Sequence, residues 1–280
     1  MRIVELDRRF RSTWDVRTIA HVVNLGHETV AKVLREVRGP RPKRVKPPHV
    51  RKTQFLKSNV MWSMDFKELP GKRWLIHTID EASGYRLGWK VCQTPTAEAA
   101  LGHMREVIQN MGKVPLVWKF DHGPAFMSRV LQAFLSHNAV LPYPIPPRAP
   151  WVQGRIERDH LEIQNWLNPV EKQDLSWETL EQEIQEGMLM LNFVKPRATM
   201  GFRTAAEVYH NLDGFEEEKR ESFRRRVEQL KFQLGPKGGE RLHRKAVRAA
   251  LQEFGLYQEW LDSPSEAETV NTSQLVKVAV

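Results

Sequence analysis

Residues 60–66 read Val-Met-Trp-Ser-Met-Asp-Phe, a short apolar segment that carries one carboxylate, Asp65. Its imperfect alternation of side chains predicts a β-strand. Two further strands are predicted over 73–80 and 85–91, with Ser83-Gly84 as the turn between them. Residues 60–91 therefore predict three consecutive strands, and the first strand contains or ends at Asp65.

The elements predicted beyond these strands alternate between helix and strand. Helices are predicted at 96–111, 126–137 and 151–167, and short strands at 114–120 and 140–145. Three strands followed by this alternation indicate an α/β fold, a mixed sheet flanked by helices. More helices are predicted C-terminal to it, over 177–194, 215–234 and 240–262, and the residues from about 263 onward predict a loose tail.

The first forty residues predict two helices, over 16–23 and 27–37, separated at Asn24-Leu25-Gly26. Asn24 can adopt the left-handed turn conformation that is usually left to glycine. The pair resembles a helix-turn-helix, whose second helix would expose Glu28, Thr29, Lys32 and Arg35 to a DNA groove, the last three as DNA contacts. An ordinary helical hairpin has the same pattern, and the distribution of charge favours the DNA-binding interpretation.

The positive charge of the chain is concentrated at its N-terminal end. The net charge is +9, yet residues 1–58 alone carry 15 Lys and Arg against 5 Asp and Glu. Within this part, residues 38–52 contain four prolines, seven basic side chains and no acidic one, which predicts an extended linker. Its basic side chains would contact DNA phosphates, namely Arg41, Lys43, Arg44 and Lys46.

Several classes of protein are disfavoured by composition. Cys92 is the only cysteine, so the chain has neither an internal disulfide nor a cysteine-based zinc site. No uncharged apolar run approaches the length of a membrane helix, so no membrane partner is expected. The expectation is a soluble, cytoplasmic protein that acts at the bacterial nucleoid.

Three carboxylates lie where strands or helices would carry them to one site. Asp65 lies in the first strand, Asp121 directly follows a buried strand, and Glu157 lies in the first turns of the helix after the proline-rich loop. Hard cations such as Mg²⁺ prefer oxygen ligands. Asp80, in contrast, is interpreted as a structural residue that holds the Ser83-Gly84 turn.

The motifs around these carboxylates resemble one known family. They are Trp62-Ser63-Met64-Asp65-Phe66, Thr78-Ile79-Asp80-Glu81-Ala82-Ser83-Gly84-Tyr85, Phe120-Asp121-His122-Gly123-Pro124-Ala125-Phe126, and Pro147-Arg148-Ala149-Pro150 leading to Gly154-Arg155-Ile156-Glu157-Arg158. In this order, with 35 residues between Asp121 and Glu157, they resemble transposases of the retroviral-integrase superfamily. The likeness is to bacterial insertion-sequence transposases with an integrase core, and it covers about residues 60–168.

The resemblance implies an RNase H-like fold and a metal-binding catalytic triad of Asp65, Asp121 and Glu157. It implies Mg²⁺ or Mn²⁺ as cofactor, two ions in all, and no small-molecule cofactor. Arg158 would help to position DNA or the active-site helix, and His122 would form hydrogen bonds beside the metal site. The partners would be double-stranded DNA, as transposon ends and target, and a second copy of the chain in a dimer or higher assembly.

The implied reaction is metal-dependent cleavage of a phosphodiester followed by attack of the freed 3′-hydroxyl on target DNA, as in a polynucleotidyl transferase. Two alternatives stay open: a nuclease of this fold that does not rejoin DNA, and an inactive DNA-binding regulator or partner subunit. The chain departs from the family at His122, where Asn is common. The predicted organisation is a helix-turn-helix domain at 1–38, a basic linker at 39–55, a catalytic core at 56–210 and a helical C-terminal region at 211–280.

Overall fold

The structure, a computed structural model, describes residues 2–39, 50–146, 154–168, 175–235 and 239–262. Its centre is a five-stranded mixed sheet with the strand order β4-β3-β2-β5-β6. The strands are β2 (Met61–Leu69), β3 (Arg73–Asp80), β4 (Arg86–Cys92), β5 (Val117–Phe120) and β6 (Leu141–Pro144). The first three are antiparallel neighbours, whereas β5 and β6 run parallel to β2, so the predicted mixed α/β sheet is confirmed.

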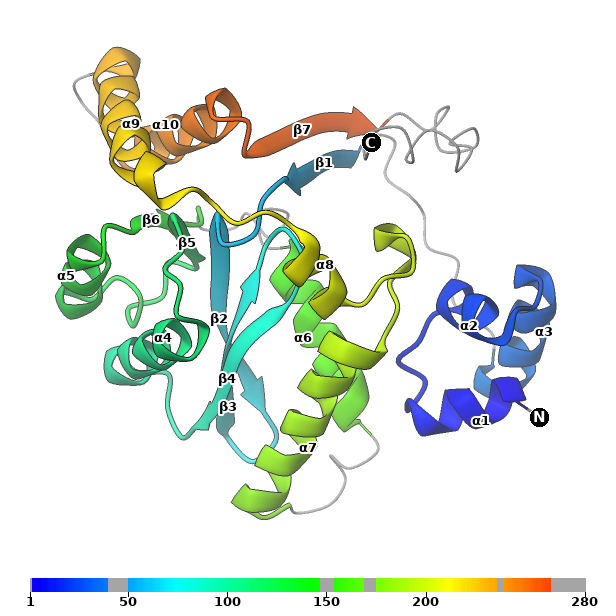
Figure 1. The fold of residues 1–280 in the computed structure, drawn as a ribbon. Helices are drawn as coiled ribbons and strands as arrows, with labels where there is room; N and C mark the ends of the chain where they lie inside the picture. The colour runs from blue at the N-terminus through cyan, green and yellow to red at the C-terminus, as the bar shows by residue number, and fades with distance from the viewer. Residues whose placement is uncertain (1, 40–49, 147–153, 169–174, 236–238, 263–280) are drawn as a thin grey trace.

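Helices cover both faces of this sheet (Figure 1). One face packs against α4 (Ala97–Met111) and α5 (Arg129–His137), and the other against α6 (Gly154–Leu167) and α7 (Trp177–Leu189). The sequence dictates this division, because successive strand side chains point to opposite faces. Ile76 of β3 belongs to the cluster with α4 and α5, whereas its neighbour Leu75 belongs to the cluster with α6 and α7.

Local capping signals set the ends of these helices. Thr96 and Ser128 accept hydrogen bonds from the amides of Ala99 and Leu131, which begins α4 and α5. Gly112 adopts the left-handed conformation (φ +57°) that ends α4. The predicted helix over 177–194 is α7 and then a five-residue π-helix, η2 (Met190–Val194).

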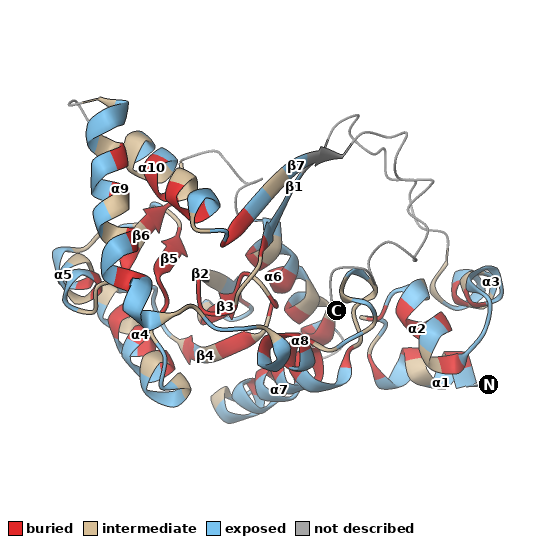
Figure 2. Cartoon of the chain, turned by 45° about the horizontal axis from the view of Figure 1, so that its top comes forward, coloured by how far each residue is buried: buried red, intermediate tan, exposed pale blue. Residues whose placement is uncertain are grey.

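The N-terminal part contains α1 (Arg2–Arg9), α2 (Val16–Val23) and α3 (His27–Arg38). Asn24 adopts the predicted left-handed conformation between α2 and α3, with φ 55° and ψ 48°. These helices are not isolated from the rest of the chain. Phe10 and Trp14, between α1 and α2, belong to the same hydrophobic cluster as Trp166 of α6 and Leu180 of α7. Figure 2 shows buried residues on the N-terminal helices as well as on α6 and α7.

The C-terminal part consists of α8 (Ala205–Asn211), α9 (Arg220–Leu234), α10 (Glu240–Glu253) and strand β7 (Tyr257–Asp262), with short helices η3 (Ala198–Met200) and η4 (Glu217–Lys219). Two predictions are corrected here. Residues 257–262 are not helical, because left-handed Gly255 ends the helix and β7 pairs antiparallel with β1 (Val50–Phe55). Residues 50–55, assigned to the linker, form that partner strand.

Within the described residues, none of the helices is long and apolar enough to cross a membrane. Residues 40–49, the proline-rich loop at 147–153 and the tail from 263 lie outside the described residues.

Candidate active site

Asp65 and Asp121 come together through the parallel pairing of β2 and β5. Ser63 of β2 is in register with Lys119 of β5. The same register, continued by two residues, brings Asp65 beside Asp121, just beyond the last residue of β5. Asp65 lies one residue after Met64, which packs against α4 and α5, so its side chain faces α6.

The electrostatics of Asp65 also involve Glu157. The pKa of Asp65 is raised to about 7, first by burial and then by the negative charge of Asp121, with a further increase from the charge of Glu157. A hydrogen bond from the amide of Phe66 and the charge of Lys67 act in the opposite direction. The charges of the other two predicted carboxylates, Asp121 and Glu157, therefore both act on Asp65.

Asp121 is held by the turn that follows β5. Its Oδ1 accepts a hydrogen bond of 2.9 Å from the amide of Gly123. A Cβ atom at Gly123 would lie only 2.9 Å from that same oxygen, so a larger residue would push the carboxylate aside. This close approach is a physical reason for glycine in the Asp121-His122-Gly123 segment.

Glu157 and Arg158 lie exposed in the first turns of α6, whereas Ile156, Asp159 and His160 are buried on the helix. Among the described residues, no group of three or more His, Cys, Asp or Glu side chains lies close enough together to hold a metal ion as it stands. The donor set nevertheless suits a hard cation, since all three side chains are carboxylates whose mutual repulsion a divalent cation would relieve.

His160 is a site residue that the sequence analysis missed. Its Nδ1 lies 3.9 Å from Oδ2 of Asp65, and its ring packs edge-on against His77 with ring centroids 4.8 Å apart. Burial, followed by the nearby charge of His77, lowers the pKa of His160 to about 3, so the ring is neutral at physiological pH. The sequence signal that could have identified His160 is its position three residues after Glu157, about one turn along the same helix.

His122, the histidine singled out from the sequence, has a different neighbour. Its Nε2 lies 2.6 Å from Oε2 of Glu240, at the start of α10. The contact joins the turn after β5 to the C-terminal helices. A hydrogen bond from His122 beside a bound metal therefore stays a prediction.

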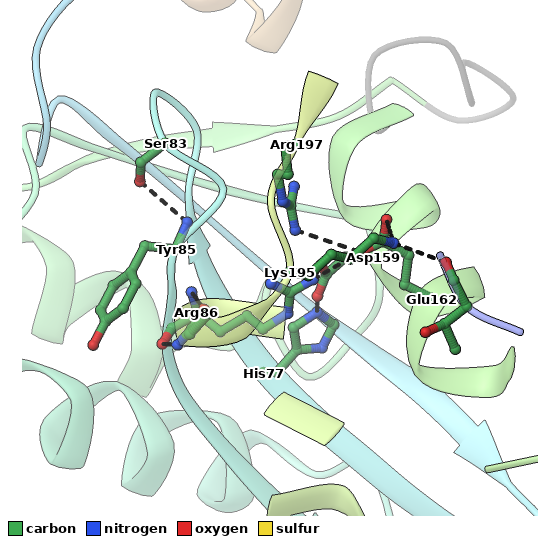
Figure 3. Close-up of polar contacts among 10 residues, drawn as sticks. His77, Ser83, Tyr85, Arg86, Asp159, Glu162, Lys195 and Arg197 are labelled. Atoms are coloured by element: carbon green, nitrogen blue, oxygen red, sulfur yellow. Dashed lines mark hydrogen bonds and ion pairs between the residues drawn. The ribbon is translucent and has the colours of Figure 1, made fainter. Parts of the chain in front are cut away.

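The buried face of α6 is attached to the sheet by ionic contacts (Figure 3). Arg86 of β4 forms a hydrogen-bonded ion pair with Asp159, and His77 Nε2 lies 3.1 Å from the other carboxylate oxygen. Arg86 also lies 3.2 Å from Glu162, one turn further along α6. Lys195 and Arg197 contact Glu162 as well, at 3.0 and 3.4 Å. The positive charges nearby, led by Arg86, hold the pKa of Asp159 well below its usual range despite its burial.

A second polar cluster holds the turn between β3 and β4. Buried Asp80 accepts hydrogen bonds from Ser83 and from the backbone amide of Asn59. These contacts agree with the prediction that Asp80 is a structural residue of this turn. The next residue, Glu81, forms an ion pair with Lys119 of β5 and lies 3.7 Å from Arg155 of α6. These cations hold the pKa of Glu81 below its usual range although the side chain is buried.

The predicted DNA-contacting residues divide into two groups. Thr29, Lys32 and Arg35 are exposed on one face of α3, whose buried side carries Val30 and Leu34. Four others lie outside the described residues: Arg41, Lys43, Arg44 and Lys46.

The comparisons with known proteins agree with this architecture. Residues 56–150 match the integrase core domain family. The chain is 28% identical to the Gag-Pro-Pol polyprotein of Squirrel monkey retrovirus, in an alignment of 151 residues that covers 49% of this chain. It is 32% identical over 125 residues to that of Mouse mammary tumor virus (strain BR6), which covers 42% of this chain. The chain spans only 7% of the length of each polyprotein.

One solved structure shows a similar fold. A simian T-cell lymphotropic virus intasome, in complex with the PP2A regulatory subunit B56 gamma, aligns with a TM-score of 0.52 and 16% identity over 77% of this chain and 78% of that one. The HTLV-2 integrase catalytic core domain in complex with magnesium aligns with a TM-score of 0.47 and 22% identity, over 56% of this chain and all of that one. Residues 56–150 therefore match an integrase core domain, and the fold is similar to that of the simian T-cell lymphotropic virus intasome.

Proposed function

We propose that this chain is a DNA transposase, a polynucleotidyl transferase that cuts transposon ends and joins them to target DNA. The observation that carries the proposal is the surroundings of Asp65. The register of β2 and β5 leads to Asp121, and the charges of Asp121 and Glu157 both act on Asp65. The integrase core domain in the same residues supports it. The place of action would be the bacterial nucleoid.

In this proposal Asp65, Asp121 and Glu157 hold Mg²⁺ or Mn²⁺. Two such ions, when bound, activate an attacking hydroxyl and stabilise the leaving oxygen of a phosphodiester. The chain's own contribution is to hold the three carboxylates. β2 carries Asp65 on the face toward α6, the amide of Gly123 fixes Asp121, and the first turn of α6 presents Glu157. Arg158, exposed next to Glu157, is proposed to contact the DNA backbone.

DNA recognition is assigned to the N-terminal helices. The exposed side of α3 carries Thr29, Lys32 and Arg35, and the ten-charge surplus of residues 1–58 suits a polyanion. Because joining two transposon ends requires two active sites, a dimer or higher assembly is proposed to form on DNA.

The test is a joining assay with labelled duplexes that carry the ends of the element, in Mg²⁺ and in Mn²⁺. The wild type is compared with Glu157→Gln and with Glu178→Gln, which changes an exposed glutamate in the first turn of α7. Joined products that vanish with Glu157→Gln and persist with Glu178→Gln support a transposase. Cleavage without joining on any duplex indicates a nuclease, and DNA binding without cleavage indicates an inactive relative.

A further inference from the structure

Three ionisable side chains are buried together under the helix that carries Glu157. The side chains of Arg86 and His77 are 0% exposed and that of Asp159 is 4% exposed. Asp159 lies two residues after Glu157 on α6, whereas Arg86 and His77 come from adjacent strands of the sheet. The contact therefore joins the active-site helix directly to β3 and β4 (Figure 3).

The position of Asp159 on the helix matters for Glu157. Successive residues of an α-helix are turned by roughly 100°, so side chains two residues apart point in nearly opposite directions. Asp159 points into the sheet, and Glu157 is exposed on the other side of α6. A rotation of the helix that moved Asp159 would consequently move Glu157 by the same angle relative to Asp65.

This buried cluster is a costly way to fasten a helix. Removing ion pairs from water carries a desolvation penalty, and apolar residues of similar size often stabilise a protein equally well. The penalty is not fully offset here. Within the described residues, the Nε and Nη1 atoms of Arg86 and the Nδ1 atom of His77 are buried without a hydrogen-bond partner. Ionic contacts differ from apolar packing in fixing direction, which suggests that geometry is what this cluster supplies.

A second set of contacts fixes the same helix one turn further along. Glu162 lies 3.2 Å from Arg86 and 3.0 Å from Lys195. The side chain of Asn192, in η2, exchanges two hydrogen bonds of 2.9 Å with the backbone of Arg86 and so covers the edge of β4. Arg86 is thus held at both its backbone and its side chain, which makes it a fixed reference point for α6.

We propose that Arg86 and Asp159 are positioning residues that set the rotation of α6 about its axis and thereby the approach of Glu157 to Asp65. The inference rests on the proposed function, since it assigns the pair a role in forming the site for the divalent cation.

The experiment compares four proteins with the wild type. Asp159→Asn and Arg86→Met break the ion pair, and the double variant Arg86→Met/Asp159→Leu replaces it with apolar side chains. Arg220→Met is the matched control, because Arg220 is also buried and ion-paired, but its partners are Glu217 and the carbonyls of Val114 and Pro115, none of which lies on α6. Free Mn²⁺ is measured by electron paramagnetic resonance during titration of each protein, and thermal unfolding is followed in parallel.

We expect both single variants to bind Mn²⁺ at least tenfold more weakly, as is common when residues that orient metal ligands are removed. The double variant should recover the unfolding midpoint but not the Mn²⁺ affinity, and Arg220→Met should keep that affinity. Recovery of both properties in the double variant would overturn the inference, because the pair would then only stabilise the fold. So would a loss of Mn²⁺ binding that merely follows the unfolded fraction.

Failure of the proposed function is distinguished by titrating Glu157→Gln with Mn²⁺ beside the wild type and by testing all the proteins for DNA joining. In that case the wild type and Glu157→Gln would bind Mn²⁺ equally and neither would join DNA, and both proposals would fall. If the wild type binds Mn²⁺ through Glu157 and joins DNA while the Arg86 and Asp159 variants match it, only the positioning role is rejected.

Discussion

Asp80 and Ser83 are joined by two hydrogen bonds to one carboxylate oxygen, at 2.9 Å from the amide and 2.7 Å from the hydroxyl of Ser83. The other oxygen accepts a hydrogen bond of 3.0 Å from the amide of Asn59. Asp80 thus ties together the start of β2 and the turn after β3, and its lone pairs are engaged within the protein. It is a structural carboxylate in a chain whose function is proposed to depend on three others.

We predict that Asp80→Ala lowers the free energy of unfolding by about 3 kcal/mol, because it leaves buried donors of Ser83 and Asn59 without acceptors. Denaturation in urea measures this change. The Mn²⁺ affinity of the folded variant should equal that of the wild type. Weaker Mn²⁺ binding at full folding would contradict the structural role.

Arg11 attaches the N-terminal helices to the core. Its guanidinium lies 4.3 Å from the ring centroid of Trp166, donates to the carbonyl of Trp166 at 3.0 Å and pairs with Glu183 at 2.6 Å. We predict that Arg11→Ala costs about 1–2 kcal/mol and speeds proteolysis of the N-terminal helices. Arg17→Ala, at an exposed position on α2, is the control. Equal proteolysis of the two variants would show that Arg11 does not hold this contact.

His103 predicts a loss of stability in acid. Burial, followed by the charges of His77 and Lys90, lowers its pKa from 6.5 to about 3. Below pH 6.5 the unfolded chain binds a proton at His103 that the folded chain does not. The contribution of neutral His103 to the free energy of unfolding is therefore fully present above pH 6.5. It falls by about 1.4 kcal/mol per pH unit as the pH drops toward 3.

The variant His103→Gln cannot titrate at this position. The stability advantage of the wild type over His103→Gln should therefore shrink as the pH falls from 6.5 to 4. Urea denaturation at several pH values measures it, and a constant difference would contradict the pKa shift.

If α3 binds DNA as proposed, variants of α3 should change the salt dependence of DNA binding. Removing one phosphate contact reduces the slope of log affinity against log salt by roughly 0.9, so Lys32→Gln/Arg35→Gln should flatten it by about 1.8. Substitution is preferable to deletion of the N-terminal part, because Phe10 and Trp14 share a core with α6 and α7. Arg17→Gln is the control, and an unchanged slope in the double variant would place the DNA contact elsewhere.

Much of the fold was predictable from local sequence patterns. The strand before Asp121 was predictable because a short apolar segment ends there in a turn signal. The strand that carries Asp65 was predictable from its imperfect alternation, although β2 continues to Leu69. The conformation of Asn24 followed from the break between two helical segments. Strand β7 was not predictable in this way, because its partner β1 lies about two hundred residues earlier and only the pairing distinguishes residues 257–262 from a helix.

The candidate site was accessible to prediction only in part. Asp65, Asp121 and Glu157 stood in recognisable motifs, whereas the contacts beneath α6 involve Arg86 and Asp159, which are 73 residues apart and carry no local pattern. His122 drew attention because it follows Asp121 in sequence. His160, in contrast, contacts Asp65 at 3.9 Å because α6 crosses that face of the sheet, and His122 contacts Glu240.

The proposed function assigns the three carboxylates to catalysis and not to DNA docking. Its most direct test measures DNA joining and DNA affinity for Asp65→Asn beside Glu68→Gln, an exposed carboxylate three residues along β2. We predict that Asp65→Asn abolishes Mg²⁺-dependent joining and binds DNA within about twofold of the wild type, while Glu68→Gln retains both activities. Joining that survives Asp65→Asn, or a parallel loss of DNA affinity, would contradict the account.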